Sequence, residues 1–346
     1  MTPSVPKTTR TIVLANPPIG EVQADTFKLE EWPLAELKDG EVLLKMLAFG
    51  NEPAQRCWMD GNTDPRRLYV EPVKQGDAVR AFGIGEILVS KSDKWEVGQR
   101  VTGVFVWQEY LVVNEGGING EAAVIPGMSE WIWLGIFGLN GLTAWAGATK
   151  ECNLKPEHTV LVSGAAGAVG SVFVQIAKKV IGCKKVVGVA GGREKCDWVK
   201  SLGADDCVDY KSKSFKKDLQ AALPDYADVF FDLAGGKVLD VALTVVARHG
   251  FISQCGALDI YNGKPLELTN YREVIYNRLT IKGFIIIDHM GSIAEATGDL
   301  GKWVQEGKIS FTGGETVVDT KFEDVPKTWQ MLFSGATRGK LITKLV

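Results

Sequence analysis

Residues 163–170 read Ser-Gly-Ala-Ala-Gly-Ala-Val-Gly, and this stretch decides the fold of the chain. The apolar run Thr159–Ser163 leads into it and predicts a β-strand. Apolar residues at helical spacing follow it and predict an amphipathic helix. These residues are Val169, Val172, Phe173, Ile176, Ala177 and Val180. A strand, a small-residue turn and a helix in this order are typical of a βαβ unit that binds a dinucleotide.

The small residues of this turn have a chemical purpose. Without bulky side chains the backbone can approach a pyrophosphate, and the N-terminus of the following helix offers unpaired N–H groups to the anion. A tight turn that binds nothing would have a similar composition, but the surrounding βαβ pattern favours cofactor binding. The loop residues expected to contact the cofactor are Gly164, Ala166, Gly167, Ala168, Val169 and Gly170.

The end of the next expected strand, Lys185–Ala190, indicates which cofactor is bound. NAD sites usually place Asp or Glu there to hold the ribose 2′-hydroxyl. Here the strand runs into Gly191 and Gly192, and the cations Arg193 and Lys195 follow. These cations could neutralise a 2′-phosphate, so we expect NADP rather than NAD. The alternative is a solvated first helical turn, where cations are electrostatically unfavourable.

The residues around this unit predict two kinds of domain. Downstream, a helix and further strands alternate and predict a parallel sheet; they are Arg193–Leu202, Val229–Asp232, Phe251–Gln254 and Leu279–Ile287. Upstream, five segments rich in β-branched and aromatic residues predict a β-domain; they are Thr11–Asn16, Asp25–Leu34, Glu41–Phe49, Ala78–Ser90 and Arg100–Asn114. Two late strand-like pieces, Glu315–Asp319 and Lys340–Val346, suggest that the chain returns to this β-domain.

Composition sets limits on the function. The 346 residues are 45% hydrophobic and 23% charged, as in ordinary soluble globular proteins. A net charge of −3 supplies no field that would attract nucleic acid. The six cysteines lack paired spacing, so we expect a reducing, cytoplasmic compartment.

Two segments bear on targeting. Met1–Arg10 carries prolines and no apolar run, so it is not expected to be a signal peptide. Residues 131–148 are long and apolar enough to resemble a membrane span. Four glycines and two polar residues interrupt them, so a buried helix fits equally well, and we expect no membrane partner.

Neither a metal site nor a hydrolase motif is apparent. The three histidines have no Cys or Glu at ligand spacing, and there is no Cys-x-x-Cys, so zinc is not expected. A Gly-x-Ser-x-Gly elbow is also missing. Without a metal to polarise an alcohol, the pattern favours hydride addition to a conjugated system.

Several motifs together carry a family resemblance over nearly the whole chain. Residues 138–145 (GLNGLTAW), 165–171 (AAGAVGS) and 188–195 (GVAGGREK) are three of them. Cys255-Gly256-Ala257 followed by Tyr261-Asn262 is another. The chain resembles the zinc-free medium-chain dehydrogenases/reductases that include leukotriene 12-hydroxydehydrogenase/prostaglandin reductase, alkenal double-bond reductases and curcumin reductase.

The resemblance implies a fold and a reaction. It implies a GroES-like catalytic domain formed by residues 1–127 and 308–346, and a doubly wound Rossmann NADP-binding domain of residues 128–307. The substrate would bind in the cleft between them. NADPH would then reduce the C=C bond of an enone or enal, with hydride added to the β-carbon and Tyr261 stabilising the enolate. The alternatives are a quinone reductase and an NADPH-binding regulatory protein without activity.

The resemblance also implies site residues beyond the glycine-rich loop. Lys195 and Tyr210 would contact the 2′-phosphate. Tyr261 would lie over the nicotinamide and the substrate, although a tyrosine at a strand end could equally be a core residue. The further cofactor contacts expected are Asn140, Thr143, Gly191, Leu233, Cys255, Gly256 and Thr337. The residues expected to contact the substrate are Glu52, Ala54 and Arg56.

Three of these positions depart from the family pattern. Ala54 stands where the family has tyrosine, and Leu233 and Thr337 each stand where it has asparagine. The substrate therefore need not be a simple alkenal.

The chain is also expected to assemble with a second copy. The late apolar strand Leu279–Ile287 resembles a sheet edge whose unpaired backbone groups must be covered by a partner. A late strand of this domain pairs across a two-fold axis in the resembling family, so we expect a homodimer.

Overall fold

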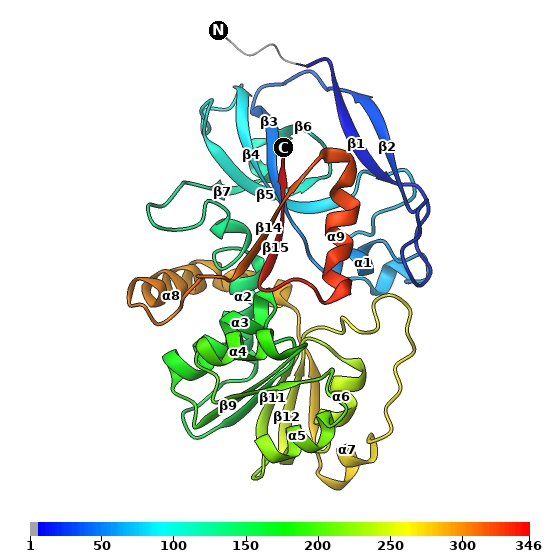
Figure 1. Ribbon diagram of the computed structural model, residues 1–346. Helices are drawn as coiled ribbons and strands as arrows, with labels where there is room; N and C mark the ends of the chain where they lie inside the picture. Colours follow the sequence, from blue (N-terminus) through cyan, green and yellow to red (C-terminus); the bar gives the residue numbers. More distant parts are fainter. Residues whose placement is uncertain (1–5) are drawn as a thin grey trace. The chain divides into compact units, whose positions relative to one another are not determined.

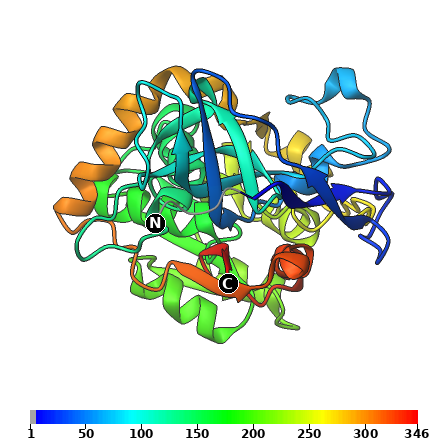
Figure 2. The same ribbon diagram turned by 90° about the horizontal axis from the view of Figure 1, so that it is seen from above.

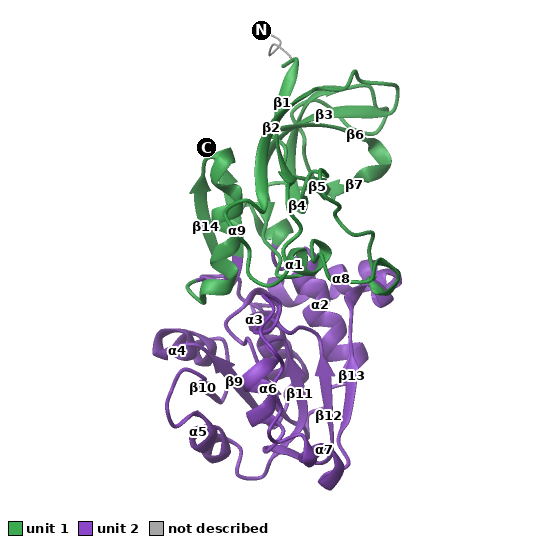
Figure 3. Cartoon of the chain, turned by 90° about the vertical axis from the view of Figure 1, so that its right-hand side faces the viewer, with its two compact units in different colours: residues 1–134, 316–336, 341–346 green, residues 135–315, 337–340 purple. Residues whose placement is uncertain are grey.

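The computed structural model describes residues 6–346, and these divide into two compact units (Figure 3). Unit 1 holds the described residues up to Leu134 together with Thr316–Ala336 and Leu341–Val346. Unit 2 holds Gly135–Glu315 and Thr337–Lys340. The roles expected for the two domains, catalytic and NADP-binding, stay predictions. So does the absence of a signal peptide in Met1–Arg10, whose first five residues lie outside the described residues.

Unit 2 is built on a parallel sheet with the order β10-β9-β8-β11-β12-β13 in the described part of the chain. Figure 1 labels β9, β11 and β12 of this sheet. The strands are β8 (Thr159–Val162), β9 (Lys185–Ala190), β10 (Asp206–Asp209), β11 (Ala227–Asp232), β12 (Val246–Gln254) and β13 (Thr280–Gly283). Counted from β8, the order is 3-2-1-4-5-6, that of the Rossmann fold. The predicted doubly wound sheet is therefore confirmed. The order reverses between β8 and β11, where such sheets bind their ligands.

Helices cover both faces of this sheet. The described helices of unit 2 are α2 (Leu139–Ala146), α3 (Ala168–Gln175), α4 (Arg193–Ser201), α5 (Phe215–Ala222), α6 (Gly236–Ala242), α7 (Arg272–Tyr276) and α8 (Ile293–Gln305), and α8 packs against α2 rather than on the sheet. On one face, Leu161 and Phe230 form a core with Leu219 of α5. On the other, the rings of Phe173 and Phe231 stack 4.1 Å apart. Side chains buried on both faces explain why the central strands β8 and β9 are nearly continuous apolar runs in the sequence.

The apolar segment 131–148 contains no long helix. Ile132–Leu134 forms a 3-10 turn, and α2 begins only at Leu139 and continues as the π-helical turn Gly147–Glu151. Across the described residues, every helix is too short or too polar to span a bilayer.

The expected strand Leu279–Ile287 is wrong in length. Only β13 pairs with β12, from Thr280 opposite Phe251 to Gly283 opposite Gln254. The chain then turns into the 3-10 segment Ile286–Ser292. Pairing ends where β12 ends, because a strand needs a partner for its backbone groups and apolar composition alone cannot supply one. As expected, β13 forms an edge of the sheet.

Unit 1 contains a mainly antiparallel sheet and a separate two-stranded ribbon, and this confirms the predicted β-domain. The ribbon pairs β1 (Thr8–Leu14) with β2 (Phe27–Pro33). In the described residues, the main sheet runs β14-β15-β3-β4-β5-β7, with β6 paired to β3. Its strands are β3 (Glu41–Gly50), β4 (Arg80–Ser90), β5 (Arg100–Val106), β6 (Tyr110–Asn114), β7 (Ile118–Glu121), β14 (Glu315–Thr320) and β15 (Lys340–Leu345).

The expected single strand Arg100–Asn114 is two strands in the structure. β5 pairs with β4, whereas β6 pairs with β3, so the chain must leave one partner and join another. It does so at Trp107–Glu109, where the Trp107 N–H donates to the carbonyl of Val79 and Gln108 bridges to Thr11. β-Propensity is continuous across this bend and could not reveal it.

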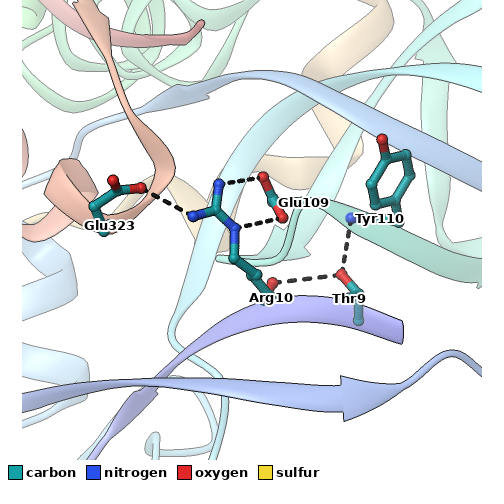
Figure 4. A network of polar contacts seen from close by, with 5 residues as sticks. All are labelled: Thr9, Arg10, Glu109, Tyr110 and Glu323. Carbon is teal, nitrogen blue, oxygen red and sulfur yellow. Dashed lines mark hydrogen bonds and ion pairs between the residues drawn. The ribbon is translucent and has the colours of Figure 1, made fainter. Parts of the chain in front are cut away.

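Most of the C-terminal segment belongs to unit 1, namely Thr316–Ala336 and Leu341–Val346, whereas Thr337–Lys340 belongs to unit 2. The end of the chain is drawn in red in Figures 1 and 2. The helix α9 (Val325–Ser334) buries Trp329 in the same core as Trp107. Figure 4 shows a polar contact that ties this segment to the first strand: Arg10 donates two hydrogen bonds to Glu109, at 2.7 and 2.8 Å, and one at 3.0 Å to Glu323. The unit is thus closed by residues from both ends of the chain.

Candidate functional site

The glycine-rich loop connects β8 to α3 at the point where the sheet order reverses. Gly164 has a φ of +56°, a conformation that side chains disfavour. A Cβ atom on Gly170 would overlap the carbonyl oxygen of Gly164, so the loop can fold back on the helix only with glycine there. Backbone N–H groups at the N-terminus of α3 are therefore not blocked by side chains of these glycines, and a pyrophosphate site requires such access.

A buried acid fixes the neighbouring loop. The Ser163 hydroxyl donates to Asp232 Oδ1 at 2.5 Å, and the N–H groups of Ala234 and Gly235 donate to the same carboxylate. The Leu233 N–H donates to the Ser163 hydroxyl at 2.8 Å. Burial raises the pKa of Asp232, while these donors oppose the shift. The hydrogen bond between Ser163 and Asp232 holds the carboxyl ends of β8 and β11 together, and the bond from Leu233 to Ser163 sets the position of Leu233.

The loop after β12 joins this cluster. The N–H groups of Cys255 and Gly256 donate to the carbonyl of Asp232, at 2.9 and 3.1 Å. Further along the loop, the half-buried Tyr261 accepts a hydrogen bond from the Ala257 N–H at 3.1 Å. Residues predicted from three separate motifs therefore share the carboxyl edge of the sheet.

The loop after β9 forms the part expected to hold a ribose phosphate. Gly191 lies against the ring of Tyr210, since a Cβ atom there would be 2.8 Å from Tyr210 Cε1. Asp209 Oδ1 accepts from the N–H groups of Gly192 and Lys211 and so shapes this turn. The strand β9 itself ends at Ala190 without an acid, as the sequence indicated.

Cations gather at this turn. Burial lowers the pKa of the half-buried Lys195, and the positive charges of Lys211 and Arg338 lower it further. Arg193 projects into solvent with 95% of its side chain exposed, 3.6 Å from Asp197. An anion would be stabilised beside Lys195, whereas Arg193 lies in a position typical of a solvated surface residue.

Three more predicted residues belong to unit 2. Asn140 and Thr143 are buried in α2, and the Thr143 hydroxyl donates to the carbonyl of Leu139 at 2.7 Å. Thr337 begins the short segment that contacts the glycine-rich loop, where the Gly339 N–H donates to the carbonyl of Ala166 at 2.8 Å. This contact joins residues more than 170 positions apart.

The predicted substrate residues lie in unit 1, around the helix α1 (Ala54–Trp58). Glu52 is buried, and its carbonyl accepts from the indole of Trp329 at 3.1 Å. Arg56 is only 1% exposed, and its guanidinium donates to the carbonyls of Pro18 and Gly20. Arg56 thus holds a loop of its own unit, and its contact with a substrate stays a prediction.

Sequence reasoning missed two groups of residues. Lys211 and Arg338 were not predicted as cofactor-binding residues. Lys211 follows the predicted residue Tyr210, and Arg338 follows the predicted residue Thr337. The Ser163–Asp232 pair was also missed, and a polar residue at the end of each of two apolar strands was the available signal. Among residues 6–346, no three His, Cys, Asp or Glu side chains are grouped to hold a metal ion.

The comparisons with known proteins agree with this geometry. Residues 10–120 match the family described as the N-terminal domain of oxidoreductase, and residues 168–300 match the family described as zinc-binding dehydrogenase. The chain is 35% identical to prostaglandin reductase 1 of Bos taurus over 331 residues, covering 94% of this chain and 96% of the relative. The chain belongs to the medium-chain dehydrogenase/reductase family.

Two further similarities fit this family. An uncharacterized membrane protein of Saccharomyces cerevisiae is 34% identical over 341 residues, covering 93% of this chain and 92% of that one. The crystal structure of CurA from Vibrio vulnificus in complex with NADPH has a TM-score of 0.88 and 30% identity, covering 97% of this chain and 99% of that one. The family resemblance expected from the motifs is thereby confirmed. Although one matching family model is named for zinc, the described residues of this medium-chain dehydrogenase/reductase carry no such ligand group.

Proposed function

We propose that this chain is an NADPH-dependent ene reductase that reduces the C=C bond of an α,β-unsaturated ketone or aldehyde. One observation carries the proposal: the glycine-rich loop, the cations around Lys195 and the loop of Tyr261 share the carboxyl edge of one Rossmann sheet. The similarity to a prostaglandin reductase and to CurA with NADPH supports it.

The residues fit NADPH. The backbone of Gly164–Gly170 can approach a pyrophosphate because three of its residues are glycines and the others are small. Lys195 and Tyr210 border the turn after β9, and β9 itself ends without the acid that holds the ribose 2′-hydroxyl in NAD sites. Leu233, Cys255 and Gly256 come next along the carboxyl edge, and NADPH would supply the hydride when bound.

Tyr261 is the candidate catalytic residue. A hydroxyl that accepts one hydrogen bond can still donate another, and tyrosine keeps its proton at neutral pH. Its O–H can therefore stabilise the negative charge that develops on the substrate's carbonyl oxygen. Ala54, in place of the family tyrosine, leaves one hydroxyl fewer for this task. The α-carbon would take its proton from water or from a neighbouring hydroxyl.

The test measures NADPH oxidation with an alkenal, a cyclic enone and a quinone in parallel, and identifies the products. We expect the saturated carbonyl compound from one of the first two. A hydroquinone alone would make the chain a quinone reductase, and no turnover with intact NADPH binding would favour a regulatory protein.

Replacement of Lys195 tests the cofactor assignment. Each lost charge-assisted hydrogen bond costs about 1.5–3 kcal/mol, so Lys195→Ala should raise the KM for NADPH about 10-fold to 100-fold. The KM for NADH should change little. Lys200→Ala, at the other end of α4, removes the same charge and should leave both values near the unmutated ones. Equal use of NADPH and NADH by the unmutated protein would contradict the assignment.

A further inference from the structure

Arg338 lies next to the glycine-rich loop although it comes late in the chain. The segment Thr337–Lys340 belongs to unit 2, and Gly339 forms a β-bridge with Gly167. The same glycine has a φ of +63°, and a Cβ atom on it would overlap the backbone of Gly314. The backbone beside Arg338 is therefore closely fixed, so the place where its side chain begins is fixed as well.

The side chain of Arg338 reaches across to α4. Its guanidinium lies 5.0 Å from the centre of the Trp198 ring, and its Nε donates to the carbonyl of Gly313 at 3.1 Å. Its ion pair with Glu194 is long, at 3.9 Å, and the Glu194 side chain is 92% exposed. Such surface pairs contribute little, so a bound anion could replace Glu194 without a large loss.

Arg338 pairs with Glu194, the residue next to Lys195, and a Cβ atom on Gly191 at the same turn would lie 3.1 Å from Lys211 Cε. The pKa of Lys195 is lowered by burial first, then by Lys211 and then by Arg338. The fold thus collects three cations at one turn, where they repel one another. Functional sites commonly hold like charges together, and a bound anion relieves the repulsion between them.

We propose that Arg338 is a cofactor-binding residue that contacts the 2′-phosphate of NADPH, together with Lys195 and Lys211. The inference rests on the proposed function and deepens it. Thr337 stands where the resembling family has asparagine, and Arg338 supplies a charged contact one residue further on. Arginine suits the task because its planar guanidinium can bind a phosphate with two parallel hydrogen bonds. With Arg338 the chain would be more selective for NADPH over NADH than it would be with an uncharged residue at the same position.

The experiment measures the dissociation constants of NADPH, NADH and 2′,5′-ADP by fluorescence titration of Arg338→Gln. We expect NADPH and 2′,5′-ADP to bind about 10-fold to 100-fold more weakly, because a charge-assisted contact is lost. NADH should bind as before. Lys200→Gln removes the same charge from α4 and serves as the matched control, and Arg338→Lys should give an intermediate loss for NADPH. Thermal unfolding without ligand should be alike for the two glutamine variants.

Three results would overturn the inference. One is NADPH affinity in Arg338→Gln within two-fold of that in Lys200→Gln. Another is an equal loss for NADPH and NADH, which would assign Arg338 to the pyrophosphate. The third is an unmutated chain that does not bind NADPH, which would remove the proposed function as well. If NADPH affinity depends on Arg338 but no enone is reduced, this inference stands and only the proposed reaction is ruled out.

Discussion

The hydroxyl of Tyr261 accepts the N–H of Ala257, and this contact orients the half-buried ring within the loop after β12. Loss of one oxyanion donor typically costs about 10²–10³ in kcat. We therefore expect Tyr261→Phe to lower kcat by about one to three decades, with the smaller loss if water substitutes. The Kd for NADPH should change little, because only the hydroxyl is lost. The rate constants come from steady-state kinetics on the best enone found.

Tyr110 in unit 1 offers a control of the same chemistry. It is half-buried on β6, and Tyr110→Phe should leave kcat unchanged. If Tyr261→Phe kept full kcat, the ring would only pack against its neighbours, and the proton donor would have to be sought elsewhere.

At the scale of the element, the start of α3 depends on glycine. The Cβ atom of Gly170→Ala would meet the backbone of Gly164 and Ala165, and overpacking of this kind costs about 1–3 kcal/mol of stability. We expect a lower free energy of unfolding in urea and weaker NADPH binding, because the shift displaces the loop that approaches the pyrophosphate.

A glycine in another helix gives the matched control. A Cβ atom on Gly298, within α8, would meet no heavy atom within 4 Å. Gly298→Ala should therefore stabilise the protein by about 0.5–1 kcal/mol, since alanine is the better helix former. Equal effects of the two substitutions would show that the loop tolerates a side chain.

At the scale of the whole molecule, the exposed edge strand β13 favours assembly. Its residues are exposed, with Ile281 at 41%, and an edge strand presents unpaired backbone groups. We expect a homodimer by light scattering at micromolar concentration, and Ile281→Lys should shift it to monomer. Val317→Lys, on the edge strand β14 with the same 41% exposure, should remain a dimer. A monomeric unmutated protein would remove this expectation.

The sequence by itself predicted the features that depend on local patterns. The strand Lys185–Ala190 has the predicted bounds, and the loop of Gly164 lies where its motif indicated. These predictions hold because hydrophobic period, turn residues and the absence of an acid after β9 are properties of neighbouring residues. The same information bounded β13 wrongly, since the length of an edge strand depends on the partner with which it pairs.

Only the tertiary structure brought distant residues to one place. Arg338 reaches Trp198 across 140 positions of sequence, and Ser163 meets Asp232 across 69. The tertiary structure also shows that Arg56 donates hydrogen bonds to the carbonyls of Pro18 and Gly20 in its own unit, whereas the sequence suggested only a contact with the substrate. Charge and hydrogen bonding act through space, so a residue's partners are decided when the strands and loops assemble, and its position in the chain does not reveal them.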